Sequence, residues 1–235
     1  MTEAFSDHTL WEHLEELRMY LLRAVIGVVV CVAVAFFFVR PIIHWLALPI
    51  GGLGKLQAIE VTENIGVYMK VAMLTGVIIS IPWVFAQFLG FVSKGLKQTE
   101  QKQLYWLIPV AVMLFVGGAA FAFFILLPSS LAVLTTFLDV ETTLRVRSYF
   151  DFLTNLVFWI AVSFELPLIV FVLAKVRLVT SSMLLKGWRI AIVAIAVLAA
   201  VITPTADPVN MLIFMVPLFG LYLLSIGLAA LAAPS

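Results

Sequence analysis

The stretch Ile160-Ala-Val-Ser-Phe-Glu-Leu-Pro-Leu-Ile-Val170 places one carboxylate, Glu165, in the middle of an apolar run. No other charged residue occurs between Asp151 and Lys175, so this run is long enough to cross a bilayer, which takes about 20 apolar residues. A charge near the bilayer centre costs about 2.5–3.5 kcal/mol on insertion scales. Because Leu or Val would avoid that cost, the sequence predicts a membrane protein in which a carboxylate at depth has a function.

The composition agrees with this prediction. The chain has 235 residues, of which 64% are hydrophobic and 11% are charged, and its mean hydropathy is +1.17. These values are typical of a polytopic membrane protein, and the net charge of +1 argues against a nucleic-acid surface. The single cysteine, Cys31, excludes an intramolecular disulfide, and three scattered histidines disfavour a metal site. We therefore expect neither a metal nor a cofactor.

The apolar runs predict one polytopic domain, residues 1–235, with six membrane spans. An amphipathic helix is expected at about 9–18, followed by spans at about 19–39, 67–92, 104–127, 150–174, 188–203 and 209–231. Prolines in or beside these spans predict bends; they are Pro82, Pro109, Pro167, Pro204 and Pro217. The expected fold is an all-α integral membrane bundle with several kinked helices, the last two short, and a concave face.

Lysine and arginine are more frequent in the predicted loops on the N-terminal side of the membrane than in those on the opposite side. Since basic loops stay in the cytoplasm, we expect both termini to be cytoplasmic. Pro204 and Asp207 lie in Thr203-Pro-Thr-Ala-Asp-Pro208, which predicts an exposed turn between the last two helices on the outer side.

Two carboxylates are expected on the cytoplasmic side. Glu16 lies near the end of the amphipathic helix, and Glu100 lies just before the third span. Each has an ordinary interpretation, as part of a solvated helix face or as an acid favoured at a helix N-terminus. Together they would form an acidic patch, and carboxylates bind guanidinium groups through paired hydrogen bonds. Such a patch beside an apolar groove suits a peptide with arginines followed by an apolar stretch, as in an export signal.

Glu165 also has two interpretations. It is either a buried polar contact that fixes helix packing, with Ser163 sharing its hydrogen bonds, or a group that meets a helix of another subunit. A rival function, proton-coupled transport of a small solute, would use Glu165 as a proton relay, although the chain has no internal repeat typical of such carriers. Motifs of intramembrane and nucleotide-using enzymes are missing, so we expect no catalytic residues and no enzyme activity.

Several motifs, in this order, resemble TatC, the multi-spanning component of the twin-arginine protein translocase. They are His13-Leu-Glu-Glu-Leu-Arg18, Gln87-Phe-Leu-Gly-Phe91, Glu100, Val162-Ser-Phe-Glu-Leu-Pro167, and Ile202-Thr-Pro204 with Asp207. The resemblance extends over nearly the whole chain. One departure is Lys94, at a position where the family usually has proline.

The resemblance implies a receptor and core subunit that binds twin-arginine signal peptides of folded proteins, with export driven by the proton-motive force. It implies a prokaryotic cytoplasmic membrane, small single-span partners of the TatA and TatB type, and several copies of this chain in the complex. The family's signal-peptide residues match Glu16, Arg18, Phe91 and Glu100. Its intramembrane glutamate matches Glu165, which is then expected to face a glove-like cavity and to contact the partner subunits.

Overall fold

The structure, a computed structural model, describes residues 4–93, 106–136, 144–203 and 208–232, with side chains from Leu14 onward. Almost all of these residues are helical. The helices are α1 (Ala4–Ala35), α2 (Val39–Leu46), α3 (Glu63–Ser93), α5 (Leu107–Phe121), α6 (Leu127–Thr136), α7 (Val146–Phe164), α8 (Leu166–Lys175), α9 (Ser181–Lys186), α10 (Trp188–Ile202) and α11 (Pro208–Ala232). A π-helical turn, Ala122–Leu126, joins α5 to α6, and two short strands, β1 (Leu56–Gln57) and β2 (Leu144–Arg145), pair in parallel.

Within the described residues, five helical segments are long and apolar enough to cross a membrane. They are Leu14–Ala35, Glu63–Ser93, Leu107–Leu134, Val146–Lys175 and Pro208–Ala232. The all-helical membrane fold is thus confirmed. The count of six spans stays a prediction, because α10 has 15 residues and extends only about 22 Å at 1.5 Å per residue. The last helix, α11, has 25 residues, so the prediction that both final helices are short is wrong for α11.

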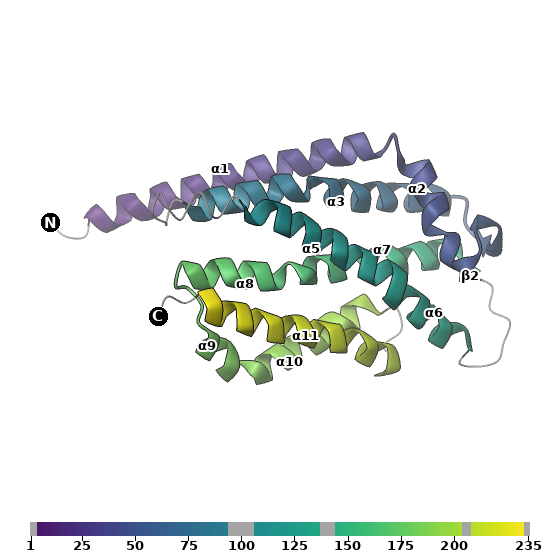
Figure 1. Cartoon of the computed structure of the whole chain (residues 1–235). Coiled ribbons are helices and arrows are strands. Elements are labelled where there is room, and N and C mark those ends of the chain that lie inside the picture. Colours follow the sequence, from purple (N-terminus) through teal and green to yellow (C-terminus); the bar gives the residue numbers. More distant parts are fainter. Residues whose placement is uncertain (1–3, 94–105, 137–143, 204–207, 233–235) are drawn as a thin grey trace.

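The long helices run roughly along one axis, whereas the short helices α2 and α9 lie across it (Figure 1). The start of α1 and the end of α11 lie at the same end of the bundle, and α2 and β2 lie at the other, called here the loop end. The predicted amphipathic segment 9–18 and the first span form one continuous helix, α1, since residues 4–35 contain no proline and a single glycine, Gly27.

A close approach of backbones holds α1 against α3. A Cβ atom added to Gly76 would lie 2.5 Å from the Val32 Cα atom, so only glycine fits there. Nearer the start of α1, the Trp83 indole donates a hydrogen bond of 2.8 Å to the Arg23 carbonyl. Helix α1 packs on the bundle by one face alone, because the most apolar stretch of the Leu14–Ala35 span has no buried residues.

Helix α7 is the centre of the core. Its buried side chains pack between α3, α5 and the π-helical turn, and they include Phe150, Leu153, Leu156 and Ile160. The predicted span 150–174 is interrupted at Glu165, where α7 ends and α8 begins. Pro167 lies in the first turn of α8, where its missing N–H has no helical partner to lose. The break therefore lies beside the intramembrane acid.

We predict that Gly76→Ala lowers the thermal stability of the purified chain, because the new methyl group meets the α1 backbone. Overpacking of this kind costs about 1–3 kcal/mol. Gly117→Ala is the matched control, since a Cβ atom at Gly117 meets nothing within 4 Å. Melting curves in detergent check the pair, and equal midpoints for the two variants would contradict the close contact.

Candidate functional site

The first candidate site lies where α1 passes the end of α3. Phe91 packs edge-on against Tyr20, with ring centroids 6.1 Å apart. A Cβ atom at Gly90 would lie 3.0 Å from the Tyr20 ring, which shows how closely the two helices meet. The guanidinium of Arg23 lies 6.0 Å from the centre of the Tyr20 ring. Tyr20 was not predicted as a site residue, because in the sequence it is one more residue at the start of the predicted first span, 19–39.

Glu16 lies one turn before Tyr20 and is half-buried, so the structure brings the helix face that carries Glu16 to the aromatic pair. Arg18 is exposed, and a spacing of two residues turns it away from Glu16. Glu100 and Lys94 lie outside the described residues, as do Pro204 and Asp207 in the predicted turn. The structure thus joins Phe91 to the turn after Glu16, while the contribution of Glu100 stays a prediction.

The second candidate site is Glu165, whose side chain is 4% exposed. Ala161 and Leu168, about one turn before and after it, belong to an apolar cluster that α7 and α8 form with α3 and α5. Within the described residues, both carboxyl oxygens of Glu165 lack a hydrogen-bond partner. A buried polar group in that condition costs about 1–3 kcal/mol, so this acid destabilises the apolar interior of the monomer.

One expectation for this site was wrong. Ser163 does not share hydrogen bonds with Glu165, because its hydroxyl donates to the Trp159 carbonyl at 2.7 Å, one turn back on the same helix. Glu165 itself is buried, and its expected position facing a concave cavity stays a prediction. The sequence places both residues on one helix but does not reveal which acceptor a serine will take.

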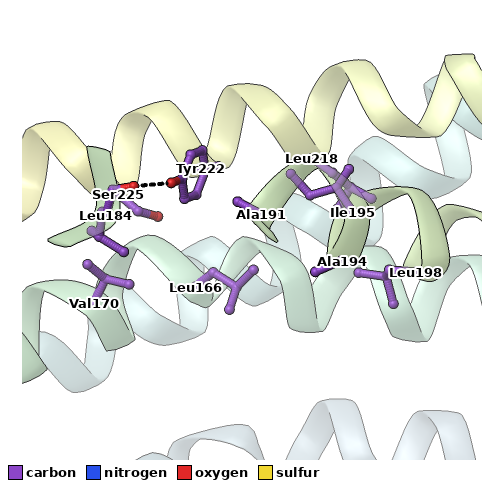
Figure 2. A pocket seen from close by; sticks show the side chains of 10 residues that line it. All are labelled: Leu166, Val170, Leu184, Ala191, Ala194, Ile195, Leu198, Leu218, Tyr222 and Ser225. Atoms are coloured by element: carbon purple, nitrogen blue, oxygen red, sulfur yellow. Dashed lines mark hydrogen bonds between the residues drawn. The ribbon is translucent and has the colours of Figure 1, made fainter. Parts of the chain in front are cut away.

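An apolar pocket of about 170 Å³ lies next to this break, between α8, α9, α10 and α11 (Figure 2). Leu166, the neighbour of Glu165, lines it together with small side chains of α10 such as Ala191 and Ala194. The Tyr222 hydroxyl, also at the pocket, donates a hydrogen bond of 2.5 Å to the Leu184 carbonyl. The hydroxyls of Tyr222 and Ser225 are hydrogen-bonded, so the pocket offers apolar surface beside Leu166, the residue that follows Glu165.

A cluster of charges closes the loop end of the bundle. Arg145 hydrogen-bonds the buried carboxylate of Glu63 and, at 2.8 Å, that of Glu60. The hydrogen bonds to Glu63 and Glu60 raise the pKa of Arg145 above its ordinary value. These pairs join the residues after β1 to β2, and the sequence did not predict them because the partners are more than 80 residues apart.

The same end carries a second ion pair, between Lys70 of α3 and Asp151 of α7, at 2.5 Å. Across the part of the chain that the structure describes, His, Cys, Asp and Glu form no group of three or more that could hold a metal ion. The charges at this end therefore connect helices and loops.

The helices and their apolar surfaces define a multi-pass membrane protein. Comparison with known proteins identifies its family. The family model for the Sec-independent protein translocase protein (TatC) matches residues 12–217. The chain belongs to the TatC family.

Individual relatives agree. The chain is 34% identical to the Sec-independent protein translocase protein TatC of Carboxydothermus hydrogenoformans over 229 residues, which cover 96% of this chain and 94% of that protein. It is 33% identical to TatC of Synechocystis over 223 residues, 94% of this chain and 87% of that protein. A crystal structure of the twin arginine translocase receptor TatC superposes with a TM-score of 0.84 at 32% identity, covering 94% of this chain and 99% of the other.

We predict that Glu165→Leu raises the thermal stability of the isolated chain in detergent. Leucine removes a buried carboxyl without a hydrogen bond, and the gain corresponds to about 1–3 kcal/mol. Glu165→Gln is the matched control, because its amide keeps the polar atoms buried and should bring little gain. A lower melting midpoint for Glu165→Leu than for the unchanged chain would show that the carboxyl has a stabilising partner inside the monomer.

Proposed function

We propose that this chain is the signal-peptide receptor and core subunit of a twin-arginine translocase. The observation that carries the proposal is the contact between Phe91 and Tyr20, one turn after Glu16. It puts an acid-bearing helix turn beside a half-buried aromatic pair and exposed apolar side chains such as Leu17 and Leu21, at one end of the bundle. Membership of the TatC family supports the same function and favours it over transport of a small solute.

The chemistry of this site suits a peptide with paired arginines. A carboxylate accepts two parallel hydrogen bonds from one guanidinium, and two carboxylates, Glu16 and Glu100, would take two arginines. Phe91 and Tyr20 offer ring surface to the apolar stretch that follows, and ring faces also attract guanidinium groups. Arg18, exposed at the same mouth, belongs to this interface in our proposal. Lys94 weakens the negative field there and so limits the affinity.

For Glu165 we propose contact with the single helix of a partner subunit of the TatA or TatB type. A partner that supplies a hydrogen-bond donor would satisfy the two bare carboxyl oxygens. Because only 4% of Glu165 is exposed, this contact requires a local opening of the helices around it. The break between α7 and α8 supports such an opening, since the helical hydrogen-bond ladder is already interrupted there.

The proposed receptor binds and does not catalyse, and the proton-motive force supplies the energy of transport. We place it in a prokaryotic cytoplasmic membrane as a single polytopic domain with six spans and both termini in the cytoplasm. The bias of basic residues supports this orientation. So does the position of the start of α1 and the end of α11 at one end of the bundle (Figure 1). Several copies would assemble in the complex.

A binding experiment with the full chain in nanodiscs tests the receptor function. A fluorescent signal peptide with two arginines should bind, and Glu16→Gln or Glu100→Gln should weaken binding about tenfold or more, since a hydrogen bond to a charged group contributes about 1.5–3 kcal/mol. Fluorescence anisotropy measures the dissociation constants, and added salt should raise them.

Glu15→Gln is the matched control, because Glu15 is exposed on the neighbouring helix position and should not contact the peptide. A second control replaces both arginines of the peptide by lysine, which cannot form the paired hydrogen bonds. Equal, salt-independent binding of the lysine peptide, or an equal loss with Glu15→Gln, would overturn the assignment.

A further inference from the structure

A groove of about 210 Å³ lies between α3 and α7, next to the loop end. Both helices begin at this end, where Glu63 and Arg145 pair, so they run in the same direction. Residue numbers in both therefore increase with distance from the loop end. Lys70 and Asp151 mark the same level, because they form an ion pair across the two helices. The groove is thus lined by two parallel helices in a known register.

The polarity of the groove falls with distance from the loop end. At its mouth, the side chains of Lys70 and Asp151 are 47% and 31% exposed. One turn further along α7, the amide of Asn155 is exposed and lines the groove. The next turns, with Val77 of α3 and Phe158 of α7, are apolar. Seven residues separate Asp151 from Phe158, which corresponds to about 10 Å along a helix.

The groups along the groove are complementary, in the same order, to those of a glycerophospholipid. A headgroup carries charge, the glycerol esters below it carry carbonyl acceptors, and acyl chains follow. An exposed amide inside a spanning segment is costly in hydrocarbon unless it has a partner, and Asn155 can donate to an ester carbonyl. Met73, Val77 and Phe158 offer apolar contact to the upper part of one acyl chain.

The charges at the mouth specify the headgroup. Lys70 has three N–H donors and Asp151 has about four acceptor positions, so their mutual ion pair uses only part of each. Arg147 lies 3.8 Å from Asp151 and also 3.8 Å from Glu60, so acids balance the bases around the mouth. A balanced pair favours a headgroup with both signs over an anionic one. A primary ammonium can donate hydrogen bonds to Asp151, whereas the quaternary ammonium of phosphatidylcholine cannot.

We propose that the α3–α7 groove binds one phosphatidylethanolamine molecule of the leaflet at the loop end. Its phosphate accepts hydrogen bonds from Lys70, its ammonium donates to Asp151, and one acyl chain lies along Val77 and Phe158. The site is far from the contact between Tyr20 and Phe91, so it is separate from signal-peptide binding and does not depend on it.

Native mass spectrometry of the delipidated full chain tests the proposal. The probes are phosphatidylethanolamine, phosphatidylglycerol and phosphatidylcholine with identical acyl chains, added singly at equal concentration. The expected result is a single adduct whose occupancy is at least fivefold higher for phosphatidylethanolamine than for either of the others. Equal occupancy by the three lipids, or a preference for phosphatidylglycerol, would overturn the proposal.

Two variants locate the adduct. Val77→Trp fills the groove and should abolish it, whereas Ile79→Trp, on an exposed position of α3 outside the groove, should leave it unchanged. The double variant Lys70→Gln with Asp151→Asn removes both charges, so neither remains unpaired, and should remove the headgroup preference. Gel filtration of each variant checks that it is folded. If Val77→Trp does not fold, the double variant decides alone, and a preference that survives in it contradicts the site.

Discussion

A buried carboxyl group without a hydrogen bond is the constraint on which the rest of this structure depends. Glu165 lies at the break between α7 and α8, and its neighbours on the helix belong to the apolar cluster with α3 and α5. An apolar interior gives such a group neither water nor a hydrogen-bond partner, so burying it costs free energy in the monomer. A hydrogen bond from a partner subunit would offset that cost, which is why we propose Glu165 as the point of contact with a partner.

Other parts of the bundle are held by specific contacts, whereas the helix is interrupted at the α7–α8 break. In the half of α3 nearer the loop end, Gly76 lets α1 and α3 approach closely. At the loop end, Arg145 ties the residues after β1 to β2 through Glu63. At the far end of α7 from these contacts, the α7–α8 break interrupts the helix, and the apolar pocket lined by Leu166 lies next to it. The proposed receptor, with peptide binding near Phe91 and partner contact near Glu165, would use this combination of rigid and interrupted helices.

Local hydropathy was sufficient to predict the all-helical membrane fold, because apolar runs in lipid have helices as their simplest structure. It also identified Glu165, since a lone charge stands out in such a run. It did not predict the pairs between Arg145 and Glu63 or between Tyr20 and Phe91, because partners 82 and 71 positions apart leave no local pattern. The continuity of α1 was missed because a polar-to-apolar change resembles a boundary even where the backbone continues. The acceptor chosen by Ser163 and the burial of Glu165 depend on packing that the sequence does not display.

The most direct test of the central claim is photo-crosslinking in intact membranes from a reactive side chain in place of Leu166, the partly exposed neighbour of Glu165. We expect an adduct with a single-span partner subunit when Glu165 is present, and its loss when Glu165 is replaced by leucine. An adduct of equal yield in the presence and absence of the carboxyl would contradict the account, because partner contact would then not depend on the buried acid.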